Sequence, residues 1–64
     1  MDLFTARAIR KMTQWDLKGK TQIHQSKISL FENGYVVPNE EERAAIAKAL
    51  CFKVDEINWS DEDK

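Results

Sequence analysis

The stretch that most constrains this chain runs from Thr13 to Gly34, TQWDLKGKTQIHQSKISLFENG. Its apolar residues recur at the spacing of two short helices separated by a turn, and they are Leu17, Ile23, Ile28 and Phe31, with Met12 just ahead. Helices of about eight residues do not persist alone in water, because helix nucleation is costly. The stretch therefore predicts two helices and a tight turn that are held in place by packing against the rest of the chain.

A chain of 64 residues has room for one small core and no deep catalytic cleft. Its apolar content of 42% and charged content of 33% are ordinary for a globular domain. The single cysteine, Cys51, allows neither an internal disulfide nor a multi-cysteine metal site. No apolar run approaches the roughly 18 residues of a membrane span, and no signal peptide is recognisable. We therefore expect one domain over residues 1–59, an acidic and disordered tail over 60–64, and a cytoplasmic location without membrane contact.

The net charge of −1 conceals an uneven distribution along the chain. Residues 1–31 carry six basic and two acidic side chains, whereas residues 32–64 carry four basic and nine acidic ones. A molecule with a basic and an acidic half can present one face to a polyanion. The alternative interpretation is that the surface charge simply varies along the chain.

Five helices and no strand are expected, which predicts an all-α fold. The first covers residues 3–11, and its inner stripe is expected to contain Leu3, Ala6 and either Ile9 or Arg10. Thr13 is the predicted N-cap of the second helix, residues 14–20, and Asp16 lies in its first turn, where the helix dipole favours an anion. The run from Gly19 to Gln22 is expected to end this helix and turn the chain.

The third helix is predicted to begin near His24 or Gln25 and to end at Asn33 and Gly34, since glycine adopts the left-handed conformation that ends helices. After an extended connector, Asn39 is the predicted cap of a fourth helix, with Glu42 in the position of a capping-box acid. The apolar face of that helix is formed by Ile46, Ala47, Ala49 and Leu50. A short fifth helix over residues 54–59 is expected to direct Val54, Ile57 and Trp59 inward.

Other chemical signals are weak. The run Gly19-Lys20-Thr21 resembles the end of a phosphate-binding loop, but the earlier glycine and the preceding strand are missing. His24 has no second ligand at metal-binding spacing, and Ser29 and His24 lie on different faces of a helix. Cys51 is expected to be a packed small residue rather than a reactive thiol. We therefore expect neither an enzyme nor a bound metal or cofactor.

Several segments together resemble a known family. These segments are Thr13-Gln14, QSKIS at 25–29, ENG at 32–34, Pro38 and AKAL at 47–50. Over residues 3–59 the chain resembles the Xre/Cro/C1 group of helix-turn-helix DNA-binding domains, which occur in phage repressors and small bacterial regulators. The resemblance implies a compact five-helix, lambda-repressor-like fold with the third helix in the major groove of DNA.

The resemblance also implies a function and a set of sites. The expected function is sequence-specific binding of double-stranded DNA as a transcriptional regulator, with repression the expected activity, by a bacterial or phage homodimer on a palindromic site. No small-molecule substrate is implied. The implied base contacts are His24, Gln25, Ser26 and Leu30, and the implied DNA backbone contacts are Thr13, Gln14, Lys27 and Tyr35. A structural ion pair between Arg7 and Glu32 is implied as well.

The chain departs from the family pattern at four positions. Lys18 replaces a small residue at the contact between the two helices, so its amine is expected to extend outward. The turn carries Gln22 in place of the usual glycine, whereas Gly19 lies inside the helix, where it costs about 1 kcal/mol relative to alanine. Cys51 replaces a helix-ending glycine and is expected to take a positive φ.

A second function stays open from the sequence. The connector Tyr35-Val36-Val37 lacks the basic residues common in relatives, and Glu40, Glu41 and Glu42 follow it, which lowers the expected electrostatic affinity for DNA. The connector can instead form an apolar surface for a partner copy, and Trp15 and Trp59 add bulky apolar groups. The alternative is therefore a protein-interaction module, either antitoxin-like or a helix-turn-helix that no longer binds DNA.

Overall fold

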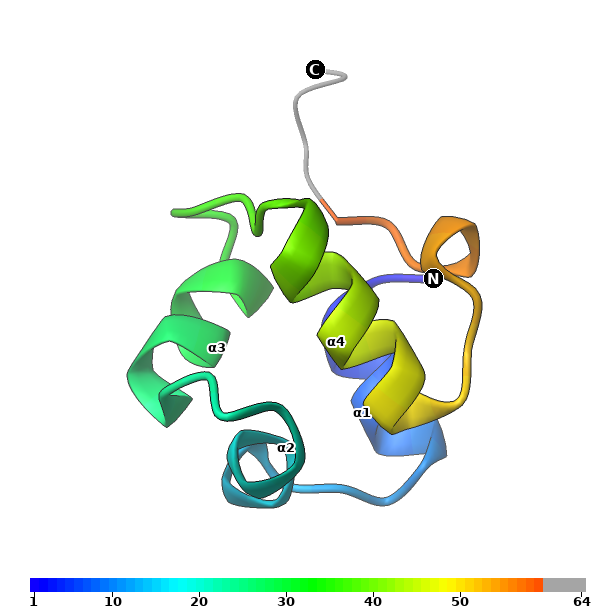
Figure 1. Cartoon of the computed structure of the whole chain (residues 1–64), viewed down its shortest axis with the longest axis horizontal. Helices are drawn as coiled ribbons and strands as arrows, with labels where there is room; N and C mark the ends of the chain where they lie inside the picture. Colours follow the sequence, from blue (N-terminus) through cyan, green and yellow to red (C-terminus); the bar gives the residue numbers. More distant parts are fainter. Residues whose placement is uncertain (60–64) are drawn as a thin grey trace.

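The computed structural model describes residues 1–59, which form four α-helices and one 3-10 turn (Figure 1). The helices are α1 (Leu3–Ile9), α2 (Gln14–Thr21), α3 (Gln25–Glu32) and α4 (Glu40–Leu50), and the turn is η1 (Val54–Glu56). No strand forms within the described residues, where only an isolated bridge joins Asp2 to Asn58, so the predicted all-α class is confirmed. The predicted tail, 60–64, lies outside the described residues.

The predicted fifth helix is wrong, because only η1 forms in its place. The backbone of Ile57 is extended, with φ −108° and ψ 134°. The indole N–H of Trp59 donates to the carbonyl oxygen of Val54 at 2.8 Å, and Asn58 pairs with the first residues of the chain. These contacts draw residues 57–59 along the N-terminal segment instead of into a helical turn.

Polar side chains begin the helices at the predicted places. Thr13 and Asp16 form a reciprocal capping box at α2, and Asn39 and Glu42 form another at α4. The backbone and side chain of Thr13 hold the pKa of the Asp16 carboxyl below its usual value. The sequence predicted the caps Thr13 and Asn39 and the capping box of α4, whereas it placed Asp16 in the first turn of α2 without predicting its bond to Thr13.

Three helices end with the same backbone arrangement. After α1, α3 and α4, the residues Lys11, Gly34 and Cys51 have φ values of 57°, 79° and 60°. In each case the next amide donates five residues back, from Met12 to Arg7, Tyr35 to Leu30 and Phe52 to Ala47. The positive φ predicted at Cys51 is confirmed, whereas α1 ends two residues earlier than predicted because Lys11 is left-handed.

The turn between α2 and α3 depends on Gln22. The second helix extends one residue beyond its predicted end at residue 20, since α2 continues to Thr21, and a Cβ atom on Gly19 inside this helix would meet nothing within 4 Å. Gln22 then takes the left-handed conformation, with φ 67° and ψ 12°, and its amide donates to the carbonyl oxygen of Lys18. The chain therefore reverses at a left-handed residue other than glycine.

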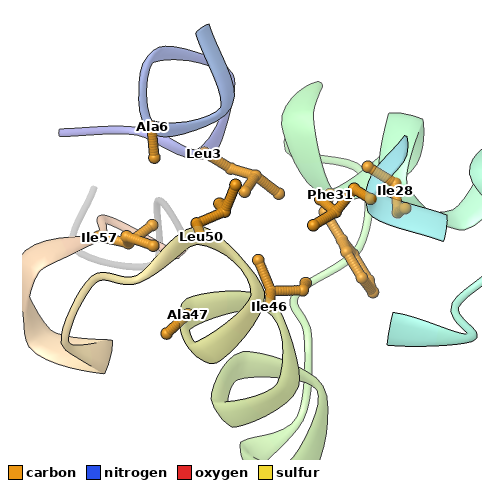
Figure 2. Packing of buried hydrophobic residues seen from close by; sticks show 9 residues of the cluster. Leu3, Ala6, Ile28, Phe31, Ile46, Ala47, Leu50 and Ile57 are labelled. Carbon is orange, nitrogen blue, oxygen red and sulfur yellow. The ribbon is translucent and has the colours of Figure 1, made fainter. Parts of the chain in front are cut away.

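The core gathers apolar residues from the four α-helices and from Ile57, which follows η1 (Figure 2). α2, α3 and α4 contribute fully buried side chains, and the buried cluster comprises Leu3, Ala6, Leu17, Ile28, Phe31, Ile46, Ala47, Leu50 and Ile57. The predicted inward positions of Ile9 and Val54 are wrong, because their side chains are 53% and 41% exposed. Ala49 and Trp59 are partly buried against the cluster, as is Ile23 in the turn.

The N-terminal helix is attached to the end of α4 through Arg10. Its guanidinium donates to the carbonyl oxygens of Leu50 at 2.7 Å and Cys51 at 3.1 Å, and it lies over the Phe52 ring at 4.2 Å. Arg10 therefore stays on the surface and satisfies carbonyl groups that the end of a helix leaves unpaired.

Among the described residues, none of the helices has the length and apolar character needed to cross a membrane.

Candidate nucleic-acid interface

The first residues of α2 and α3 meet at their side chains. Gln14 opens α2 and Gln25 opens α3, and Figure 1 shows these two helices as neighbours. Nε2 of Gln25 donates to Oε1 of Gln14 at 3.4 Å. Both side chains are half-buried. The fold thus brings together one residue implied to contact DNA bases and one implied to contact the DNA backbone.

Glu32 lies behind this pair and holds the Gln14 amide. Its Oε1 accepts from Nε2 of Gln14 at 3.0 Å and from Nη2 of Arg7 at 3.1 Å. Its Oε2 accepts from Nε of Arg7 at 2.7 Å. The side chains of Arg7 and Glu32 are only 13% and 7% exposed, so the ion pair implied by the resemblance is largely buried.

Arg7 also attaches this cluster to the start of the helix-turn-helix. Its Nη1 donates to the carbonyl oxygen of Met12 at 2.8 Å, just before the cap of α2. Among the described residues, no buried side-chain nitrogen or oxygen is left without a hydrogen-bond partner. A buried charge is costly unless it is paired and hydrogen-bonded, and Arg7 meets both conditions.

His24 and Ser26 bond to each other at the start of α3. Nδ1 of His24 accepts from the amide of Ser26 at 3.1 Å and lies 2.8 Å from the Ser26 hydroxyl oxygen. His24 is therefore the N-cap of α3, a role that the sequence does not signal because serine, threonine, aspartate and asparagine are the usual caps. Both side chains are exposed at the N-terminal end of α3.

Lys27 forms an ion pair that sequence reasoning missed. Its Nζ lies 2.7 Å from Oε2 of Glu42, in the first turn of α4. The hydrogen bond from Lys27 and the backbone amide of Asn39 together hold the pKa of the Glu42 carboxyl below its usual value, although partial burial opposes them. The two residues are fifteen positions apart, so only the tertiary structure, which brings Lys27 of α3 to the first turn of α4, reveals the pair.

The remaining implied contacts lie on the surface. The Leu30 side chain is 39% exposed and Tyr35 is 77% exposed, while Thr13 is an exposed cap. In the connector, Val36 packs against the core and Pro38 is buried, so only Tyr35 and Val37 present apolar surface. Lys18 is half-buried, and its amine lies 5.1 Å from the ring centroid of the exposed Trp15. The Lys18 side chain therefore extends outward, as expected.

The expected packing of Cys51 is wrong. Its side chain is exposed, because the left-handed backbone at the end of α4 turns Cys51 away from the core. Within residues 1–59, no three His, Cys, Asp or Glu side chains lie close enough to hold a metal ion.

Comparisons of the chain with family models, curated proteins and solved structures found no match.

Proposed function

We propose that this chain binds double-stranded DNA sequence-specifically and acts as a transcriptional repressor with a lambda-repressor-like helix-turn-helix. The observation that carries the proposal is the contact between Gln14 and Gln25, which brings the starts of α2 and α3 to one surface. In a helix-turn-helix, the start of the second helix meets the base edges while the first helix crosses the backbone. The two glutamines open α2 and α3, which supports this arrangement.

The side chains at this surface suit the two kinds of DNA contact. Glutamine forms a bidentate pair with adenine, and serine bonds to several bases, which suits Gln25 and Ser26 to base contacts together with His24 and Leu30. Thr13, Gln14, Lys27 and Tyr35 offer hydroxyl, amide and ammonium groups for phosphates, which position a protein without specifying a sequence. An eight-residue helix such as α3 is about 12 Å long and fits the major groove.

The bond between Lys27 and Glu42 moderates the electrostatic part of this binding. A phosphate must compete with the Glu42 carboxylate for the Lys27 ammonium, which lies 2.7 Å from it in the DNA-free chain. Since phosphate contacts supply most non-specific affinity, we expect weak binding to random DNA and a greater dependence on base contacts. A homodimer on two half-sites about 34 Å apart supplies the additional affinity.

Selection of bound duplexes from a random library tests the proposal, and a palindromic motif is the expected result. Gln25→Ala should then relax the preference at one base pair of each half-site, and Lys27→Ala should weaken binding to all sequences alike. Titrations on the selected duplex and on variants of it measure both effects. Identical behaviour of the two variants, or a library without enrichment, contradicts the proposal.

Exposed aromatic side chains favour a protein-interaction module as a second candidate. Tyr35, Trp15 and Phe4 are 77%, 61% and 57% exposed. Trp59 does not add to this exposed aromatic surface, because it packs partly against the core. Salt dependence separates the two candidates, since affinity for random duplex DNA falls steeply with salt when phosphates are contacted. If the affinity for random duplex DNA shows no steep salt dependence and the chain forms a stable complex with a protein, the protein-interaction module is favoured.

A further inference from the structure

We infer that Glu32 is a specificity-determining residue, which acts through Gln14 to fix the direction of the Gln25 amide and so makes Gln25 select adenine over guanine. The inference rests on the proposed function. Its basis is a chain of three hydrogen bonds that runs from the ion pair in the interior to the start of α3. Glu32 is a positioning residue, since it lies largely buried behind Gln14.

The direction of these hydrogen bonds is set at their buried end, at Glu32. A carboxylate only accepts hydrogen bonds, so Glu32 requires the nitrogen side of the Gln14 amide to face it, and Nε2 of Gln14 lies 3.0 Å from Oε1 of Glu32. Oε1 of Gln14 must then face the other way, toward Gln25, where it accepts from Nε2 at 3.4 Å.

The Arg7 guanidinium keeps Glu32 in the form that this direction requires. Two of its N–H groups donate to the carboxylate, at 2.7 Å and 3.1 Å. A planar fork of donors matches a charged carboxylate, and a neutral amide at position 32 would place a donor against one of those N–H groups.

Gln25 is left with one donor and one acceptor. One hydrogen of its Nε2 is used by Gln14, and within residues 1–59 its second amide hydrogen and its Oε1 make no other hydrogen bond. Adenine presents one acceptor, N7, and one donor, N6–H, in the major groove, whereas guanine presents two acceptors, N7 and O6. The held amide therefore matches adenine and places its oxygen against a guanine acceptor.

Loss of this chain of hydrogen bonds has a consequence that a general loosening of the structure does not have. A released Gln14 can reverse its amide and donate to Oε1 of Gln25, which leaves both Nε2 hydrogens of Gln25 available for guanine. The preference for adenine over guanine should then fall, while the preferences for adenine over cytosine and over thymine should stay the same. A merely structural role for Glu32 would lower all three preferences together.

The test measures these three ratios of dissociation constants on the selected duplex, with the base pair that responds to Gln25→Ala varied. Two variants break the chain: the double substitution Arg7→Met with Glu32→Met, and the single substitution Gln14→Met. The double substitution replaces both charges by chains of similar length, because removal of one partner alone would leave a buried charge. The matched control is the double substitution Lys27→Met with Glu42→Met, which removes the other ion pair of α3.

In the unchanged protein we expect a preference for adenine over guanine of about tenfold or more, since a bidentate pair discriminates on that scale. Both chain-breaking variants should lower this ratio by about fivefold with little change in the other two. The control variant should weaken binding to every duplex and leave all three ratios unchanged. If the double variant fails to fold, as judged by circular dichroism, Gln14→Met decides alone.

The failures can be told apart. An unchanged ratio of adenine to guanine in the folded variants overturns the role of Glu32, and a parallel fall of all three ratios does so too. In both cases an effect of Gln25→Ala on base preference leaves the proposed function standing. If the unchanged protein shows no sequence preference, both the proposed function and the inference are overturned.

Discussion

Replacement of Cys51 by glycine should stabilise the protein. Cys51 ends α4 in the left-handed conformation, with φ 60° and ψ 38°. A side chain in this conformation costs about 1–2 kcal/mol, because its Cβ approaches the following carbonyl oxygen. Glycine avoids that contact but loses about 0.5–1 kcal/mol more conformational entropy than alanine on folding. The net gain expected for Cys51→Gly is therefore about 0.5–1 kcal/mol.

The structure leaves little to oppose this gain. The thiol is exposed, and the hydrogen bonds at this position use the backbone of Cys51, whose amide donates to Lys48 at 3.1 Å and whose carbonyl oxygen accepts from Arg10 at 3.1 Å. Glycine keeps both bonds. Gly34 provides the reverse case, since it ends α3 at φ 79° with the same pattern of backbone bonds. Gly34→Ala should therefore destabilise the protein by a similar amount.

Thermal and urea unfolding followed by circular dichroism measure these changes. For a domain of this size, 1 kcal/mol corresponds to a Tm shift of about 4–8 °C, so Cys51→Gly should raise the Tm by roughly 2–8 °C. Cys51→Ala is the control, because it removes the thiol and keeps the Cβ atom, and its Tm should stay close to that of the unchanged protein. Equal effects of glycine and alanine at position 51 would refute the strain argument.

Three further predictions concern stability. Gly19→Ala should stabilise α2 by about 1 kcal/mol, since a Cβ atom there meets nothing within 4 Å, and a lower urea midpoint would contradict this. Arg7→Met should cost about 3–5 kcal/mol by leaving the largely buried Glu32 charge unpaired, whereas Arg7→Met with Glu32→Met should unfold near the original midpoint. The pKa of Glu42 is lowered from its ordinary value of 4.5, first by the hydrogen bond from Lys27. The ionised Glu42 carboxylate therefore stabilises the protein at pH values above 4.5, and this stability is lost as the pH falls through the lowered pKa. Glu42→Gln should remove this part of the acid sensitivity, and parallel curves of unfolding free energy against pH would show the reasoning to be wrong.

Interactions over three or four residues were predicted well from the sequence. The caps Thr13 and Asn39 and the capping box of α4 form as expected, and Gly34 follows the end of α3 as expected. The caps depend on side chains that reach their own backbone, and Gly34 depends on its own positive φ, so no knowledge of packing is needed. The sequence was weaker at the ends of helices, since α2 continues to Thr21, one residue beyond the predicted end.

The identity of the implied site residues also came from the sequence, but the connections among them did not. Gln14 and Gln25 lie eleven positions apart, and Glu32 lies seven further on, so nothing local relates them. The bond between Lys27 and Glu42 likewise forms only because the fold brings a residue of α3 to the first turn of α4. Ile9 shows the same limit for the core, because it lies inside α1 as predicted and its side chain is nevertheless 53% exposed.

The sequence by itself determined where α2, α3 and α4 begin, that Leu17, Ile28, Ile46 and Leu50 enter the core, and that Thr13 to Gly34 forms two short helices about a turn. Only the tertiary structure decided that Glu32 holds Gln14, that Gln14 holds Gln25, and that Lys27 faces Glu42. The physical reason is the range of the interactions. Caps and turns form within one segment, whereas the direction of a buried amide depends on acceptors that the folding of distant segments brings to it.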